Sequence, residues 1–440
     1  MDRCAGDRRR RLHLPLMNDL ASNAQETSAE RHAARGAALA CMVTLAVALG
    51  IGRFAFTPLL PLMLHGSVSG QPQIDIQHGG WLASFNYAGY FIGAVMCAAL
   101  RVEPARMVRA GLVGTVLLTL AMGGTSQFWI WAVVRFVAGA VSAWTFVFAS
   151  QWGLRRLAEL GAHGWGGVIY TGPGVGIVGT GLLVSVAGGY GATAGWIGFG
   201  LIAAVLSIVV WPVFGAAHRS TARSAGAGTA RSTAGAHAGQ HAPSRTAHRA
   251  DAFWLVLLYG VPGFGYIITA TFLPVIARHA LPGSAWPDLF WPMFGAALIV
   301  GALLAARLPV HWDNRTLLAG CYVLQACGIA LGIVWPTAGG FSLGSMLIGL
   351  PFTAITLFAM REARRLRGDD AAGLMGYATA AYGIGQIVGP LVAAPIAEHT
   401  GSFSPALWLA AGALLLGAAG LIGVARMPRG RSRMPDCGCS

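Results

Sequence analysis

Long apolar stretches alternate with short polar segments along most of the 440 residues. A helix that crosses a bilayer needs about 20 mostly apolar residues, and twelve stretches of the chain meet this requirement. They cover approximately residues 36–63, 79–100, 107–124, 128–151, 163–187, 193–215, 252–277, 285–306, 316–336, 340–361, 371–397 and 402–425. The pattern therefore predicts an all-α membrane protein with twelve transmembrane helices.

A polar segment divides the twelve stretches into two sets of six. Residues 216–251 consist mainly of small residues, Arg and His, with almost no large apolar side chain. Such a segment cannot bury a core, so we expect a flexible linker. The predicted organisation is an N-terminal tail (1–35), a first six-helix bundle (36–215), the linker, a second six-helix bundle (252–426) and a C-terminal tail (427–440).

A short motif occurs near the start of both predicted bundles. A Gly-x-Gly sequence ending at Gly52 is followed nine residues later by Pro61, and one ending at Gly265 is followed nine residues later by Pro274. Duplicated apolar halves with paired helices broken by Gly and Pro are typical of secondary transporters. We therefore expect these four residues to shape broken helices that move during transport.

The fraction of charged residues indicates whether water or lipid surrounds the protein. The chain is 55% hydrophobic and only 10% charged, whereas soluble domains carry about a quarter charged residues. So few charges cannot cover a surface that faces water. This composition favours a bilayer.

The positive charge follows the predicted topology. All 30 basic residues are arginine, and 27 of them fall on one side of the membrane if there are twelve helices. The positive-inside rule then places both termini and the linker in the cytoplasm, in a bacterial inner membrane. Because topology accounts for the net charge of +14, we do not expect nucleic-acid binding.

Three motifs resemble those of one transporter superfamily. The sequence Gly50-Ile-Gly-Arg-Phe-Ala-Phe-Thr-Pro-Leu-Leu-Pro-Leu-Met63, together with the twelve helices and the central linker, resembles the YbfB/YjiJ-type branch of the major facilitator superfamily (MFS). Arg135-Phe-Val-Ala-Gly139 is similar to the superfamily's Arg-x-x-x-Gly motif. Gly172-Pro173-Gly-Val-Gly176 is similar to its Gly-Pro-x-x-Gly motif, which is associated with antiport. The resemblance covers about residues 36–426 and implies two pseudo-symmetric bundles around a central cavity.

One motif departs from the superfamily. Its loop between helices 2 and 3 carries Gly-x-x-x-Asp-Arg-x-Gly-Arg, but here that loop has no Asp, only Glu103. The second copy, between helices 8 and 9, keeps Asp313 but is also degenerate. These departures argue against the superfamily's usual charge relay at the inner gate.

Two arginines lie within predicted helices. Arg53 and Arg135 fall about halfway through helices 1 and 4, near the bilayer midplane. Placing an arginine there costs roughly 2.5–3.5 kcal/mol, so each should face a cavity. No acidic residue lies deep in a predicted helix, and Asp288 and Glu398 lie only near helix ends. A bound carboxylate could supply the missing negative charge; alternatively, each arginine donates to helix carbonyls or extends toward an interface.

Further candidates lie at similar depth. We expect substrate contacts from polar and aromatic side chains at Asn86, Tyr90, Tyr170, Tyr266, Tyr382 and Gln386. The alternative for each is a hydrogen bond between helices. Glycine- and proline-rich runs in helices 5 and 11 should control close packing and rocking of the halves, through Gly172, Pro173, Gly176, Gly385, Gly389 and Pro390.

These features predict a secondary transporter that moves a small organic anion bearing a carboxylate by alternating access. A proton-coupled efflux antiporter for neutral or cationic compounds is the alternative, and a non-transporting membrane sensor is a remote one. The chain has no Walker motif and no lysine, which excludes ATP-driven transport by this chain alone. We expect no enzyme activity, cofactor or metal. The expected partners are the substrate, a coupling ion (H⁺ or Na⁺) and lipid, with the protein a monomer.

Overall fold

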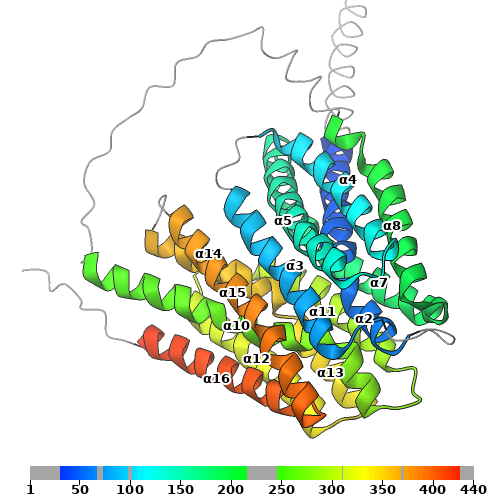
Figure 1. Cartoon of the computed structure of the whole chain (residues 1–440). Helices are drawn as coiled ribbons and strands as arrows, with labels where there is room; N and C mark the ends of the chain where they lie inside the picture. The colour runs from blue at the N-terminus through cyan, green and yellow to red at the C-terminus, as the bar shows by residue number, and fades with distance from the viewer. Residues whose placement is uncertain are drawn as a thin grey trace, which may run out of the picture.

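The computed structural model describes residues 30–66, 73–97, 102–215, 245–309, 311–367 and 371–426 (Figure 1). The terminal residues 1–29 and 427–440 lie outside this description. So does the predicted linker, apart from residues 245–251.

Regular structure in the described residues is entirely helical. Residues 30–45 form a helix that continues into a π-helical segment, η1. The elements are η1 (Ala46–Ile51), α2 (Phe56–His65), α3 (Ile76–Cys97), α4 (Pro104–Gly123), α5 (Phe128–Glu159), η2 (His163–Trp165), α6 (Gly166–Ile169), α7 (Gly172–Ala187), η3 (Gly188–Tyr190), α8 (Gly191–Val210), α10 (Arg245–Ala280), α11 (Pro287–Arg307), α12 (Asn314–Val334), α13 (Ala338–Gly349), α14 (Phe352–Arg367), α15 (Ala371–Thr400) and α16 (Ser404–Arg426).

These elements confirm the all-α fold with twelve predicted membrane helices. Within the described residues, eleven helical segments are long and apolar enough to cross a membrane. The twelfth is α3, whose 22 residues include polar side chains that face the other half of the molecule. One boundary differs clearly from expectation, because α10 begins at Arg245 instead of residue 252.

The surface of the bundle suits a bilayer. Large apolar side chains such as Val186, Ile208, Val334 and Leu416 are strongly exposed, on four different helices. In lipid, every main-chain polar group needs an internal partner, which helices provide. The exposed apolar surface and the helical backbone therefore fit the same solvent.

Two bundles pack side by side (Figure 1). The N-terminal bundle, coloured blue to green, lies at the upper right, and the C-terminal bundle lies at the lower left. They meet where α3 contacts α15, α7 contacts α11, and α2 contacts α10. We call the end of the assembly at which residue 30 and α10 begin the linker side.

Close glycine contacts recur inside each bundle. Gly50 on η1 lies directly against Gly176 on α7, and a Cβ atom on either would overlap the other's backbone. In the second bundle, Gly385 on α15 lies equally close to the backbone of α10 at Gly260 and Gly263. These contacts join helices within one bundle, so they set the internal packing of each half.

The first membrane helix is broken at its middle. The main-chain N–H groups of Gly52 and Phe54 donate five residues back, to Val47 and Leu49, at 2.9 Å each. A turn over residues 52–55 follows before α2 begins. Pro58 and Pro61 lie within α2 and supply no N–H. The chain around Arg53 therefore has main-chain carbonyls without ordinary helical partners.

The equivalent break expected in the second bundle is wrong, because α10 continues as one α-helix past both of its prolines. Pro262 frees the carbonyl of Leu258, which accepts a 2.9 Å hydrogen bond from the Tyr322 hydroxyl. Pro274 frees the carbonyl of Ala270, which accepts a 2.8 Å hydrogen bond from Thr57 in the other bundle. Neighbouring hydroxyls thus replace the missing N–H groups, and the helix stays continuous.

Candidate functional site

Arg53 lies on the turn that breaks the first helix, between the two bundles. Its side chain is 5% exposed. Its Nη2 donates a 2.9 Å hydrogen bond to Oε1 of Gln386 on α15, in the other half. The hydrogen bond places a buried cation directly at the interface between the halves.

Aromatic rings surround this cation. The Arg53 Cζ lies 4.1 Å from the ring centre of Tyr90, 5.0 Å from that of Tyr87 and 5.2 Å from that of Phe54. Ring faces attract a cation through their negative quadrupole but do not neutralise it. The Tyr87 hydroxyl also pairs with Thr271 Oγ1 at 3.1 Å, which joins the halves again.

The positive charge of Arg53 is only partly compensated. Among the described residues no carboxylate forms an ion pair with it, and its buried Nε has no hydrogen-bond partner. A guanidinium keeps its charge at any physiological pH. The site therefore has an unused capacity to bind negative charge.

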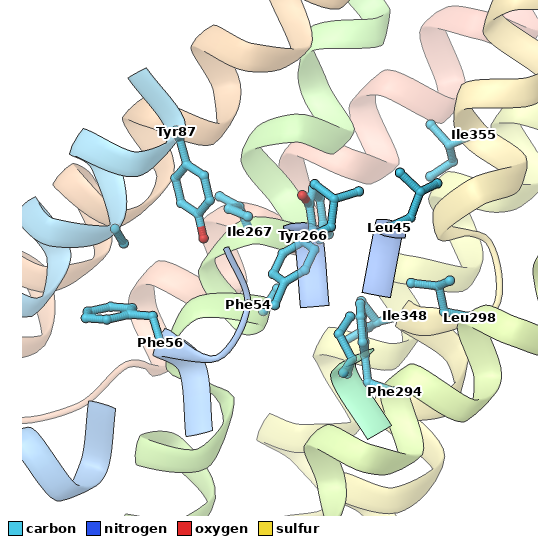
Figure 2. Packing of buried hydrophobic residues seen from close by; sticks show 14 of the residues in the cluster. Leu45, Phe54, Phe56, Tyr87, Tyr266, Ile267, Phe294, Leu298, Ile348 and Ile355 are labelled. Atoms are coloured by element: carbon cyan, nitrogen blue, oxygen red, sulfur yellow. The ribbon is translucent and has the colours of Figure 1, made fainter. Parts of the chain in front are cut away.

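Gln386 connects Arg53 to a column of tyrosines. Its Nε2 donates to the Tyr266 hydroxyl. The Tyr266 ring stacks on Tyr382 with centres 6.0 Å apart, and Tyr382 stacks on Tyr259 at 5.0 Å. Figure 2 shows Phe54, Tyr87 and Tyr266 gathered among the buried apolar side chains. The structure thus brings together four predicted site residues and Arg53.

Two members of this cluster were missed from the sequence. Tyr87 lies beside two residues that were selected, and Tyr259 precedes Tyr266 by seven residues, which places both on one helical face. A search for tyrosines at helical spacing would have found Tyr259. The same search would have found Tyr87, which lies three residues before Tyr90 on α3.

Arg135 also has a buried Nε without a partner among the described residues, but its other donors bind main-chain carbonyls instead of a side chain. Its Nη1 donates to the carbonyl of Gly52 and its Nη2 to the carbonyl of Arg53, both at 3.3 Å. Its guanidinium also lies 4.7 Å from the ring centre of Phe56, and Asn86 Nδ2 donates to the Arg135 carbonyl at 2.8 Å. The side chains of Arg135 and Asn86 thus both donate to main-chain carbonyls of another helix. This matches the alternatives considered for them, which were hydrogen bonds to helix carbonyls for Arg135 and between helices for Asn86. Arg135 holds the broken helix, and Asn86 holds α5.

The remaining candidates have packing roles or lie apart. The Tyr170 ring lies against Phe146 at 6.2 Å, and Tyr170 is not among the rings over Arg53. A Cβ atom would collide with a neighbouring segment at each predicted glycine: Gly52, Gly172, Gly176, Gly265, Gly385 and Gly389. Pro390 contacts Gly80 across the interface between the halves.

One carboxylate beyond the predicted spans is buried, which was not expected from the sequence. Glu362 in α14 is 0% exposed, and its Oε1 lies 2.7 Å from Nε of Arg315 on α12. Arg315 also binds Asp251 on α10 at 2.7 Å and the Val424 carbonyl at 3.2 Å. This cluster lies on the linker side, where α10 and α12 begin and α14 and α16 end. A buried charge network is therefore present in the second half, despite its degenerate loop motif.

No set of three or more His, Cys, Asp or Glu side chains in the described part of the chain could hold a metal ion. A cavity of about 550 Å³ opens on the side opposite the linker, with His65, Asp75, Arg278 and His279 among its lining residues. Arg53 does not line it. The chemistry of the charged site therefore rests on its side-chain contacts and not on this cavity.

Comparison with known proteins identifies the family. The sequence profile of the family described as "Uncharacterised MFS-type transporter YbfB" matches residues 45–422. The chain belongs to this family of MFS transporters. It is accordingly a multi-pass membrane protein of a transporter class and not of an enzyme class.

Two relatives add detail. The chain is 27% identical over 388 residues to a chloramphenicol resistance protein of Streptomyces lividans, which covers 82% of this chain and 89% of the relative. Its fold is similar to the crystal structure of a point mutant of the nucleoside transporter NupG. That comparison gives a TM-score of 0.66 at 12% identity and covers 88% of this chain and 99% of the other. The second similarity shows the fold alone.

Proposed function

We propose that this transporter moves a small organic anion, and that Arg53 binds its negative group. The observation that supports this most directly is the incomplete pairing of Arg53. It is buried and donates to a neutral amide, and in the part of the chain that the structure describes its Nε has no partner. A carboxylate can bind two guanidinium N–H groups side by side, so it supplies both the missing charge and the missing acceptor.

The surrounding rings indicate the shape of the solute. The stacked tyrosines of the second half and the rings around Arg53 offer flat apolar faces next to the cation. Aromatic rings stack on such faces with favourable energy. We therefore propose a planar or aromatic carboxylate as the preferred solute class.

The position of this site supports a mechanism of alternating access. Arg53 belongs to the first half and Gln386 to the second, and the contact between them lies at the interface. A solute bound there touches both halves, so its binding favours some relative arrangements of the halves over others. An ion or solute gradient across the membrane would drive the cycle.

The test uses purified protein in proteoliposomes and a panel of small aromatic carboxylates, each paired with its neutral carboxamide. We expect uptake of a carboxylate and not of its carboxamide. Arg53→Gln should abolish this uptake, and Arg53→Lys should weaken it markedly, because lysine keeps the charge but loses the planar fork. Arg307→Gln removes the same charge from an exposed position and should leave uptake unchanged. Uptake of carboxamides alone would contradict the proposal.

Efflux of neutral compounds is the second candidate, since the relative from Streptomyces lividans is described as a chloramphenicol resistance protein. The same rings could stack a neutral aromatic compound. Expression in a drug-sensitive host distinguishes the candidates. Chloramphenicol resistance that persists in Arg53→Gln would favour neutral efflux, and unchanged susceptibility would favour the anion.

We further propose that both termini and the linker face the cytoplasm of a bacterial inner membrane. The support is the charge distribution, with 27 of 30 arginines on that side. A phosphatase reporter fused after Ser440 should be inactive. Activity that requires the periplasm would contradict this orientation.

A further inference from the structure

Gln386 has a fixed orientation between Arg53 and Tyr266. An arginine side chain has only donors, so the amide oxygen Oε1 must face it, as the 2.9 Å hydrogen bond shows. The amide nitrogen then faces the Tyr266 hydroxyl, which accepts its hydrogen bond. Gln386 is 3% exposed and Tyr266 is fully buried, so no water competes freely for these contacts.

This orientation places a neutral oxygen where a carboxylate oxygen would neutralise the arginine. Glutamate has the same shape as glutamine, and its oxygen would occupy the position of Oε1. The Tyr266 hydroxyl could then donate instead of accept, because a hydroxyl does both. The pocket is therefore compatible in geometry with either residue, and only the amide leaves the charge of Arg53 available.

We infer that Gln386 is the residue that determines charge selectivity, so that its neutral amide makes the site select anions. The inference rests on the proposed function and extends it to a second residue. With a carboxylate at this position, Arg53 would be paired internally and an incoming anion would meet a like charge. With the amide, an anionic solute is the partner that completes the pairing.

The first measurement needs no transported solute. Full-length protein in lipid nanodiscs is compared in four forms: wild type, Arg53→Gln, Gln386→Glu and the double variant. Gln386→Glu should raise the unfolding temperature when Arg53 is present and lower it in the Arg53→Gln background, where the new carboxylate is buried without a partner. Equal shifts in both backgrounds would overturn the inference.

The second measurement follows uptake of the carboxylate that the wild type transports. Benzoate and benzamide, together with the other carboxylate and carboxamide pairs of the panel, are added as competitors of this uptake. Gln386→Glu should weaken binding of the carboxylate by about 100-fold relative to its carboxamide. Gln386→Met removes the amide but stays neutral, so it should keep the carboxylate preference. Gln151→Glu adds the same charge at an exposed position on α5 and should also keep it.

The outcomes separate the two ideas. A wild type that prefers carboxylates, with a Gln386→Glu variant that keeps this preference, overturns the selector role alone. Loss of the preference in Gln386→Met overturns it as well, because neutrality would then not be the determinant. A wild type without preference for any carboxylate over its carboxamide overturns the proposed function, and the selector role with it.

Discussion

Arg53 in the first half and Arg315 in the second are both buried, but their partners differ. Arg315 is 2% exposed and binds two carboxylates and one main-chain carbonyl with Nε and both Nη groups. Arg53 donates to the neutral amide of Gln386, lies against three aromatic rings, and has an Nε without a partner among the described residues. A fully paired arginine stabilises the helices around it, whereas an incompletely paired one can still bind a ligand. Burial alone therefore does not distinguish these two arginines, but their partners do.

The largest expected effect is on the fully paired arginine. Glu362→Gln removes one of its two carboxylates and also affects Arg365, which contacts the same oxygen at 2.8 Å. Because the charges are buried, we expect the free energy of unfolding to fall by about 3–5 kcal/mol. Thermal unfolding in detergent measures this change.

The matched control is Glu159→Gln, which removes an exposed carboxylate paired with Arg156 at 3.0 Å. An exposed pair contributes about 0–1 kcal/mol. If both variants lost the same stability, burial would not distinguish the two pairs.

The second effect concerns Arg135, which binds main-chain carbonyls instead of a charge. Arg135→Gln should leave the carbonyl groups of Gly52 and Arg53 without donors, at a cost of roughly 1–3 kcal/mol. Hydrogen exchange around residues 50–57 should accelerate, because the broken helix loses its support. Unchanged exchange there would show that the turn is stable without Arg135.

The third effect concerns Arg53 itself. Arg53→Gln should leave the free energy of unfolding unchanged or raise it by up to about 1 kcal/mol, because it removes a buried charge that has no counter-ion within the described ranges. The same unfolding measurement applies. A loss as large as that of Glu362→Gln would make Arg53 a structural residue of the Arg315 kind.

The last effect concerns a neutral contact between the halves. Thr57→Val removes the hydroxyl that donates to the Ala270 carbonyl, so we expect a loss of about 1 kcal/mol. The transport rate should change as well, since this contact joins α2 to α10. Thr379→Val is the control, because its hydroxyl is exposed and bonds only within α15, to Met375. Equal transport rates in the two variants would exclude a role of this contact in gating.

Much of the fold could be predicted because a bilayer imposes helix length and apolar surface together. The number and order of helices follow from these constraints. The continuity of α10 could not be predicted, since it depends on hydroxyls of Tyr322 and Thr57, far away in sequence. The start of α10 at Arg245 was not predicted for a related reason. Asp251 is polar in sequence, but it is bound by Arg315 in the fold.

The candidate site was partly predictable. Arg53, Gln386, Tyr266 and Tyr382 stood out because polar or phenolic groups are rare in apolar helices, and the structure brings them together. Glu362 was missed because it lies among several arginines at the end of its helix, and such a charged stretch predicts a loop. The pattern of residues gives the depth of a side chain in the membrane, but its partners depend on helix rotation.

The support of the broken helix and the proposed solute contact depend on different chemical groups. Arg135 donates to main-chain carbonyls, which every amino acid possesses, and these hydrogen bonds do not involve the side chain at position 53. These hydrogen bonds therefore do not depend on which side chain occupies position 53. A single codon change at this position could install a neutral, acidic or shorter group on the same support. Under the proposed role of Arg53, solute recognition can therefore change by mutation while the support of the broken helix stays the same.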